Sequence, residues 1–218
     1  MKLSGRLAAA VSLIPKHTVI ADIGTDHGYI PVYMCQEGLC PKAIAADIVP
    51  GPLQAAAVHV RQSGLADRID CRLGDGLTCI QPGEADGAVI CGIGGPLMVR
   101  ILQASPGVWQ EMDFLVLQPQ SDSGAVRQYL YESGWHIEDE GMLVEDGRLY
   151  ELMRAVPGRE AVPEPWLCEI GPVNWQRKHP LLVRKITSLI NKNEHIRIGL
   201  TKSRSDMSAR IQALDEEI

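Results

Sequence analysis

The chain has 218 residues, of which 45% are hydrophobic and 22% are charged, and its 21 basic and 27 acidic side chains give a formal net charge of −6. This composition excludes a chain that is mainly disordered, because such chains combine low hydrophobicity with a much higher net charge. The acidic total also excludes a wholly basic nucleic-acid-binding protein. The sequence contains no apolar run of about 18 residues, so we expect no transmembrane helix.

The N-terminal segment combines a basic residue with a short apolar stretch, as a signal peptide does. Arg6 interrupts the stretch and no small-x-small cleavage site follows it, so we predict an amphipathic helix that packs on the domain and ends near Pro15. The six cysteines form no CxxC pair and have no matching histidine spacing. This pattern favours reduced thiols in a cytoplasmic protein and argues against a metal site.

From Thr18 onward, short β-branched runs alternate with helical stretches. Strands are predicted at residues 18–24, 42–48, 68–76, 85–95 and 113–120, and helices at 29–38, 52–63 and 123–134. Crossover helices indicate a parallel sheet, because a tight hairpin cannot join parallel neighbours. Two further strand-like segments, 135–147 and 148–156, are divided by a Glu-Asp-Gly turn typical of a hairpin. The pattern predicts an α/β fold with a doubly wound, Rossmann-like sheet that ends in an antiparallel hairpin.

The composition changes after Val156, where a proline-rich connector, PGREAVPEP, begins. Apolar residues then recur at three- and four-residue spacing, with a break at residues 203–205, which predicts a helical hairpin of unequal arms. We therefore expect two domains, residues 1–157 and 158–218. The charge divides with them, because residues 1–171 hold 12 basic and 22 acidic side chains, whereas residues 172–218 hold 9 and 5.

The loops that follow the parallel strands are where such a sheet binds its ligand. The first, DIGTDHGYIP, is glycine-rich, but Asp26 stands where a dinucleotide-binding fingerprint has its second glycine. A carboxylate there would repel a pyrophosphate. S-adenosylmethionine has no phosphate and carries sulfonium and ammonium groups, so the loop favours this cofactor. A tight turn with capping acids would explain any one of these residues by itself.

Each of the next four loops also carries polar or glycine residues. Asp47 can accept hydrogen bonds from both ribose hydroxyls of an adenosine ligand, or can cap the following helix. Asp75 can accept from an adenine amino group, or can simply form a turn. The fourth loop, CGIGG, suggests that a ligand approaches the backbone closely, and the fifth, LQPQ, offers amides. Together and in this order, the five loops favour a class I methyltransferase.

The segments ADIGTDHGYIP, ADIVPGPLQAA, GDGL, ICGIGG and LQPQ, followed by the hairpin segments and a helical tail, give the chain a family resemblance. From Leu3 to its end, the chain resembles the bacterial TrmK family, whose members are S-adenosylmethionine-dependent tRNA methyltransferases that modify N1 of adenine 22. On this resemblance we assign the cofactor site to Asp22, Gly24, Thr25, His27, Gly28, Asp47, Ile48, Gly74, Asp75, Gly76, Cys91 and Gly92. Asp26, Gly92, Gly94 and Gly95 are assigned to the transferred methyl group and the target base.

The chemistry of the implied reaction requires alignment more than it requires a base, because N1 of adenine already carries an available lone pair. Asp26 is the candidate acceptor near the developing positive charge, and the alternative is that it fixes the cofactor ammonium. N1 lies on the pairing edge of adenine, so the enzyme must take an exposed base or turn one out of its stack. Tyr29 is the candidate stacking residue.

Binding of tRNA also requires contacts to phosphates. Between Pro172 and Ser205 the sequence has eight basic residues and one acid, Glu194. We assign substrate contacts to Tyr29, Gln118, Pro119, Arg177, Lys178, Arg184, Lys185, Lys192, Arg197 and Lys202, although scattered Lys and Arg usually form a solvated helix face. The alternatives are a methyltransferase of the same fold that acts on another RNA or a small molecule, and a non-catalytic RNA-interaction protein. We expect a cytoplasmic monomer with no membrane or metal partner.

Overall fold

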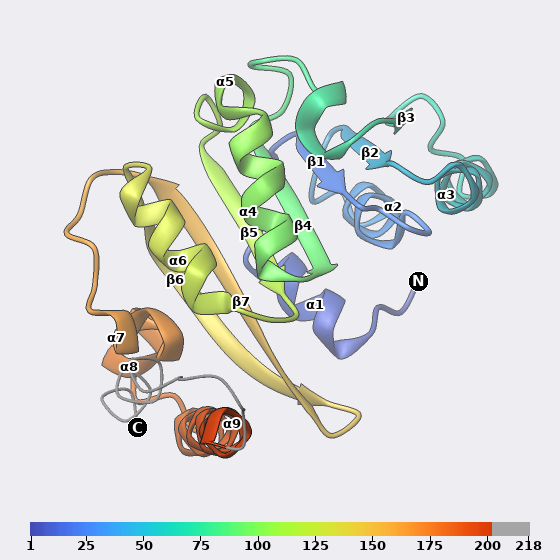
Figure 1. Ribbon diagram of the computed structural model, residues 1–218. Coiled ribbons are helices and arrows are strands. Elements are labelled where there is room, and N and C mark those ends of the chain that lie inside the picture. The colour runs from blue at the N-terminus through green and yellow to red at the C-terminus, as the bar shows by residue number, and fades with distance from the viewer. Residues whose placement is uncertain (202–218) are drawn as a thin grey trace.

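The computed structural model describes residues 1–201 and contains a seven-stranded sheet in the order β3-β2-β1-β4-β5-β7-β6 (Figure 1). The parallel strands are β1 (Ile20–Ile23), β2 (Ala43–Asp47), β3 (Ile69–Leu73), β4 (Gly87–Ile93) and β5 (Phe114–Pro119). The hairpin consists of β6 (Trp135–Glu145) and β7 (Arg148–Pro157), and β7 lies between β5 and β6, antiparallel to both. The predicted Rossmann-like α/β fold with a closing hairpin is confirmed.

Helices cover both faces of the sheet. One face packs against α1 (Gly5–Ser12), α2 (Tyr29–Gln36) and α3 (Pro50–Gln62), and the other packs against α4 (Gly95–Ala104), α5 (Pro106–Trp109) and α6 (Ser123–Glu132). Successive strand residues alternate between these two apolar layers, as in β4, where Val89 belongs to the layer of α1, α2 and α3 and Ile90 belongs to the layer of α4, α5 and α6. After β3 a single 3₁₀ turn, η1 (Gly76–Cys79), stands where a longer crossover helix would cover the sheet.

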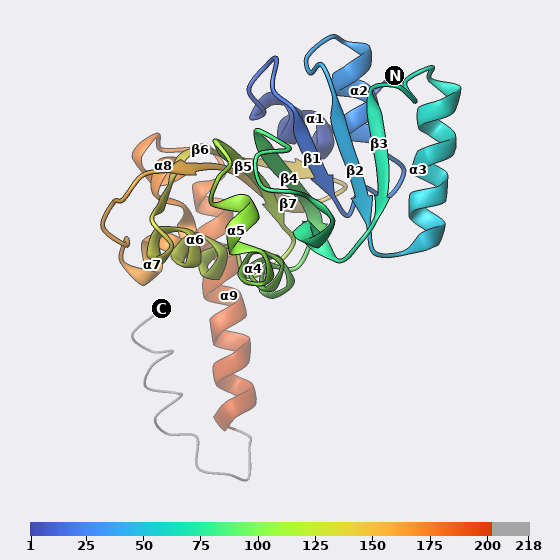
Figure 2. The same ribbon diagram turned by 90° about the horizontal axis from the view of Figure 1, so that it is seen from above.

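Within residues 158–201, three helices follow the hairpin: α7 (Pro165–Ile170), α8 (Pro172–Gln176) and α9 (Leu182–Thr201). The sequence pattern missed α7 and α8, because helices of one or two turns contain too few residues to show a periodicity. The first arm of the expected helical hairpin corresponds to α9, which projects beyond the body in Figure 2. The second expected arm, residues 207–218, lies outside the described residues. No helix within residues 1–201 combines the length and apolarity needed to span a membrane.

A buried network of charges joins α9 to the hairpin. Arg127 of α6 contacts Glu140 at 2.8 Å and Glu151 at 3.4 Å, and Nζ of Lys185 in α9 lies 2.8 Å from Oε2 of Glu151. Burial by itself would raise the pKa of Glu151, but Arg127 and Lys185 outweigh this effect and hold that pKa below its usual range. An apolar cluster that includes Leu182 packs beside the network. The start of α9 is therefore fixed on the body.

Candidate active site

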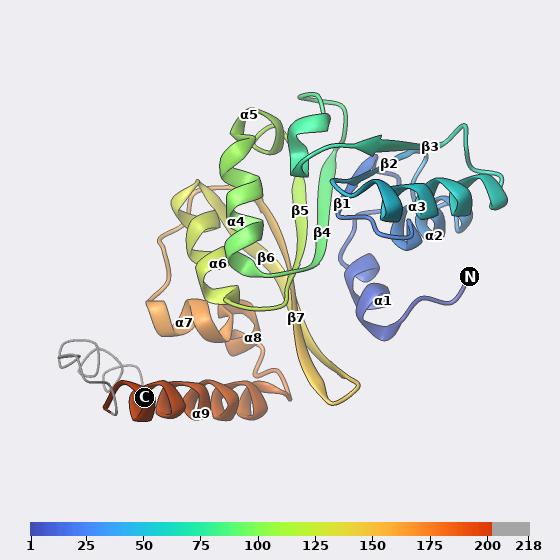
Figure 3. The same ribbon diagram turned by 45° about the vertical axis from the view of Figure 1, so that its right-hand side comes forward.

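The candidate site lies at the carboxyl ends of the parallel strands. β1 pairs with β2 on one side and β4 on the other, so the strand order reverses between β1 and β4. A doubly wound sheet forms its ligand crevice at this reversal. Figures 1 and 3 show α1 beside the ends of β4 and β5, so this helix borders the same edge.

The loop after β1 adopts an unusual backbone. Gly24, Asp26 and Gly28 have φ angles of +73°, +50° and +68°. A side chain at Gly24 would meet no atom within 4 Å, which leaves the backbone there open to a ligand. Asp26 is one of the residue types that tolerate a left-handed conformation. Its side chain is 66% exposed, and its N–H donates to Oδ2 of Asp47 at 3.3 Å. The loop thus presents an exposed carboxylate beyond the end of β1, with Oδ1 of Asp26 3.7 Å from Nε2 of His27.

Asp22, in contrast, is buried at the end of β1. Burial raises the pKa of Asp22 to about 7, and the charge of Asp47 adds to this increase. The hydroxyl of Thr25 donates to Oδ2 of Asp22 at 2.7 Å and opposes the increase. A bound cation would favour the ionised form of such a carboxyl. The site therefore contains a buried acid that is suited to a positively charged ligand.

The ends of β2 and β3 provide a polar and an apolar surface side by side. Oδ1 of Asp47 accepts the N–H of Val49 at 2.8 Å, which forms a turn before α3; the N-cap residue of this helix is Val49, so Asp47 does not cap it. The carboxylate keeps further acceptor capacity for a ligand. The side chains of Ile48 and Leu73 are 59% and 57% exposed. Leu73 is the register partner of Asp47, and the exposed Asp75 follows two residues later. We did not assign Leu73 to the site from the sequence, in which its only distinguishing feature is its place directly before Gly-Asp-Gly.

Several glycines of the site pack against the protein itself. A Cβ at Gly74 would lie 2.5 Å from Cβ of Cys79, and one at Gly76, whose φ is +57°, would lie 2.7 Å from Ile101. A Cβ at Gly95 would lie 2.6 Å from the carbonyl oxygens of residues 121 and 122, and one at Gly94 would lie 3.2 Å from the Ser121 hydroxyl. Close approach of the loop after β5 therefore accounts for glycine at position 95, and the assignment of Gly94 and Gly95 to the methyl group and the target base stays a prediction.

A row of side chains crosses the ends of β4 and β5 on the α1 side of the sheet. Gln118 is fully buried, and its Oε1 accepts a hydrogen bond from Nη1 of Arg6 at 2.9 Å. We expected Gln118 to contact the substrate, but its side chain is buried and holds Arg6 instead. Burial raises the pKa of the neighbouring Cys91 thiol. This indicates a packed thiol rather than a nucleophile. Arg6 was missed in the sequence, because its contact to Gln118 spans 112 residues.

Tyr29 belongs to an aromatic cluster beside the loop after β1. Its ring centre lies 5.4 Å from that of His27 and 5.7 Å from that of His59. The main-chain oxygen of His27 lies 2.9 Å from Nδ1 of His59, which ties the loop to α3. Tyr29 remains 42% exposed, so one side of its ring is available for stacking.

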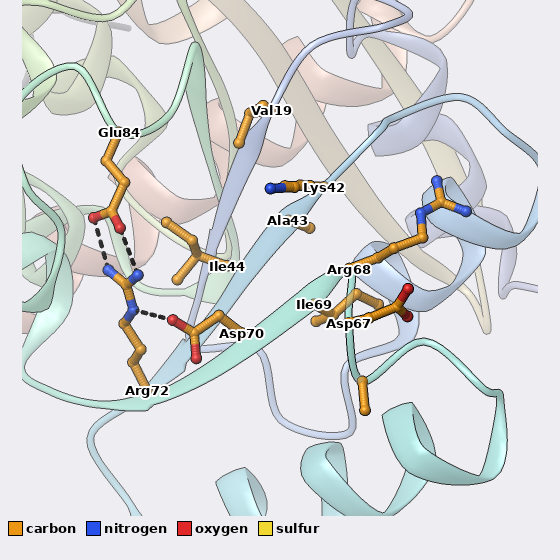
Figure 4. Close-up of a pocket in the computed structure, with 11 residues that line it drawn as sticks. Val19, Lys42, Ala43, Ile44, Asp67, Arg68, Ile69, Asp70, Arg72 and Glu84 are labelled. Carbon is orange, nitrogen blue, oxygen red and sulfur yellow. Dashed lines mark hydrogen bonds and ion pairs between the residues drawn. The ribbon is translucent and has the colours of Figure 1, made fainter.

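One cavity of the described part of the chain lies away from this site. It measures about 460 Å³ and is lined by Val19, Lys42 and Arg68, which precede β1, β2 and β3 and so lie at the opposite ends of the strands. Figure 4 shows the guanidinium of Arg72 between the carboxylates of Glu84 and Asp70 in its wall.

The basic residues assigned to tRNA occupy different environments. Lys185 is buried against Glu151, so it serves the fold and is unavailable to a phosphate. Arg177 pairs with Asp139, and Arg184 donates to the main-chain oxygen of Gly147. Lys178, Lys192 and Arg197 have exposed side chains, and Lys192 lies 3.7 Å from Asp122. Lys202 lies outside the described residues. Pro119 lines a second cavity of about 260 Å³, between the loop after β5 and α9.

Comparison with known proteins agrees with this geometry. Residues 3–153 match the family of methyltransferase domains. The tRNA (adenine(22)-N(1))-methyltransferase of Bacillus subtilis is 36% identical over 201 residues, which cover 90% of this chain and 84% of that protein. The crystal structure of the B. subtilis m1A22 tRNA methyltransferase TrmK, 32% identical, superposes with a TM-score of 0.88 and covers 100% of this chain and 99% of its own. A candidate tRNA (m1A22) methyltransferase of Streptococcus pneumoniae in complex with S-adenosyl-L-methionine, 29% identical, gives a TM-score of 0.86 with 99% of both chains covered. The chain belongs to the TrmK family of tRNA (adenine(22)-N(1))-methyltransferases.

Proposed function

We propose that this protein transfers the methyl group of S-adenosyl-L-methionine to N1 of adenine 22 in tRNA. The observation that carries the proposal is an open glycine loop with the carboxylates of Asp22, Asp26 and Asp47 beside the strand-order reversal, and with Asp75 following β3 at the same edge of the sheet. Such a site suits a cationic adenosine ligand without phosphates. The similarity to the B. subtilis enzyme over 90% of the chain supports the choice of substrate.

In this proposal, the ends of β2 and β3 hold the adenosine part of the cofactor. Asp47 accepts hydrogen bonds from the ribose hydroxyls, as an acid at this position does in related sheets. The exposed side chains of Ile48 and Leu73 cover the adenine ring, and Asp75 accepts from its amino group. The buried Asp22 and the open backbone of Gly24 lie toward the methionine part.

When bound, the cofactor supplies an electrophilic methyl group beside the loops after β1 and β4. The residues of this chain then have to align the adenine N1 with that group, which lowers the entropic barrier of the transfer. Asp26 presents an exposed carboxylate on a constrained backbone, where it accepts from the adenine amino group and stabilises the positive charge that develops on the ring. Tyr29 supports the base by stacking.

The tRNA contact in this proposal extends from the site along α9. The second cavity, which Pro119 lines together with Lys192, connects the loop after β5 with this helix. Among the residues that the structure describes, Lys178, Lys192 and Arg197 have exposed side chains and are candidates for phosphate contacts. Lys185 is not a candidate, because it is buried. We further propose that the enzyme acts as a cytoplasmic monomer.

The test is methyl transfer from labelled S-adenosyl-L-methionine to tRNA transcripts that differ only at position 22. We expect label on N1 of adenine 22 in the unmodified transcript, and none when guanine replaces that adenine. Asp26→Asn retains the left-handed backbone and removes the charge, so it should lower the turnover more than the cofactor affinity. Label on a different nucleotide or only on small molecules would refute the substrate assignment.

A further inference from the structure

The loops after β4 and β5 are joined by main-chain hydrogen bonds. The N–H of Gln120, directly after β5, donates to the main-chain oxygen of Ile93 at 2.8 Å. The N–H of Gly95, at the start of α4, donates to the main-chain oxygen of Ser121 at 3.0 Å. Figure 1 shows both loops at the same end of the sheet. The two loops therefore form one surface, on which the position of Gln120 is fixed relative to the end of β4.

The two glutamines of the segment LQPQ have different environments. Gln118 is fully buried and accepts the hydrogen bond of Arg6, whereas Gln120 is exposed. Within residues 1–201 the carboxamide of Gln120 has no hydrogen-bond partner, and its Nε2 lies 3.8 Å from the position of a Cβ built on Gly92. Gln120 also lines the second cavity, beside α9. An available amide therefore lies between the end of β4, where the methyl donor is proposed to bind, and the helix proposed to contact tRNA.

The proposed reaction limits how the enzyme recognises its target base. N1 of adenine must point at the methyl group, so no protein group binds N1 during the transfer. The exocyclic amino group and N7 lie on a different edge of the ring and stay accessible. A glutamine amide matches this edge, because its oxygen accepts from the amino group while its nitrogen donates to N7. Guanine carries an oxygen in place of the amino group, so the amide oxygen would face a second acceptor.

We propose that Gln120 selects adenine as the target base by binding its amino group and N7. The inference rests on the proposed function, because it assumes that N1 of adenine accepts the methyl group. The amino group carries two hydrogens, so Gln120 takes the one beside N7 and leaves the other for Asp26. Gln120 is then a specificity residue that contacts the substrate and takes no part in the transfer itself. It fills the role that the sequence pattern assigned to Gln118.

The experiment is single-turnover methyl transfer, with the protein in excess but below saturation, to tRNAs that carry adenosine or 7-deazaadenosine at position 22. The deaza compound has a C–H group in place of N7. Gln120→Ala should lower the rate on adenosine by about 10- to 100-fold, the usual discrimination of a bidentate amide. The ratio of its two rates gives the intrinsic reactivity of the two bases.

The other proteins are compared with this ratio. The wild-type protein should favour adenosine by about 10-fold relative to it, because 7-deazaadenosine leaves the amide N–H without an acceptor. Gln120→Glu keeps an acceptor for the amino group but places a second acceptor at N7, so it should favour 7-deazaadenosine. Gln103→Ala, which removes an exposed glutamine of α4, is the matched control and should behave as the wild-type protein does.

Three results would overturn the inference. The same ratio of rates for the wild-type protein, Gln120→Ala and Gln120→Glu would mean that the amide does not contact N7. Calorimetric binding of S-adenosyl-L-methionine to Gln120→Ala that is weakened by more than about 2-fold would assign the amide to the cofactor instead of the base. If the wild-type protein methylated neither tRNA, the proposed function itself would fail, and the inference would fail with it.

Discussion

Replacement of Asp22 by asparagine should stabilise the protein, and the gain should depend on pH. Asp22 is 4% exposed, and burial raises its pKa from 3.8 to about 7. The folded state therefore binds this proton more tightly than the unfolded state does. Since stability falls with pH wherever the folded state binds more protons, the wild-type protein loses stability between about pH 4 and about pH 7. Asparagine removes that loss and can still accept the hydrogen bond from Thr25.

The magnitude follows from the difference in pKa. At about 1.4 kcal/mol per pH unit, a rise from 3.8 to about 7 corresponds to a cost of about 4 kcal/mol in alkaline solution. By the same relation the cost is about 2 kcal/mol near pH 5. We therefore expect the stabilisation by Asp22→Asn to grow by about 2–3 kcal/mol between about pH 5 and pH 8.

The assay is urea unfolding of the cofactor-free protein at a series of pH values. Asp26→Asn is the matched control, because Asp26 lies in the same loop region but is 66% exposed. Its free energy of unfolding should stay within about 0.5 kcal/mol of the wild-type value. A gain for Asp22→Asn that is the same at every pH would refute the reasoning, since it would show that the carboxyl does not titrate in this range.

Three further results are expected. Lys185→Ala should lower the free energy of unfolding by about 3 kcal/mol, because it leaves the buried carboxylate of Glu151 short of a cation. In the same urea assay Lys192→Ala, which removes a 59% exposed side chain, should change this free energy by less than about 1 kcal/mol. Gly95→Ala should lower the free energy of unfolding by more than about 2 kcal/mol, because its Cβ would lie 2.6 Å from two backbone oxygens. Gly107→Ala, in open space on α5, should leave this free energy unchanged or raise it by up to about 1 kcal/mol. Equal melting temperatures of the two variants would contradict this expectation. Lys178→Asn, which suits the φ of +52°, should reduce the salt dependence of tRNA binding by about one phosphate contact, and an unchanged slope would exclude Lys178 from the interface.

The fold and the location of the site could be predicted because both depend on local patterns. Alternating strands and helices fix a parallel sheet, and a parallel sheet brings the loops after its strands to one edge. The end of β1 with Asp22 and the loops with Asp47 and Asp75 therefore lie at the same edge of the sheet. Trp135, the aromatic residue that begins β6, is 2% exposed and belongs to the apolar core that such a sheet requires.

Side-chain environments that depend on distant packing could not be predicted in this way. Arg6 and Gln118 are 112 residues apart in the chain, so neither residue indicates its partner. Lys185 and Lys192 look equivalent in the sequence, yet one is buried and the other is exposed. Gly95 looked like a ligand-binding glycine, but the chain segment that requires it lies after the next strand.

The division of charge along the chain has a second explanation in the structure. The acidic body and the basic C-terminal part suggested a cofactor domain joined to an RNA-binding arm. Lys185 and Lys192, two turns apart on one face of α9, both point to acids of the body, and Arg177 pairs with Asp139 in the same way. Part of the positive charge therefore docks the arm. Lys192 keeps 59% of its side chain exposed, so the phosphate contact proposed for it requires only that it exchange Asp122 for the RNA, while the buried Lys185 keeps the start of α9 fixed on the body.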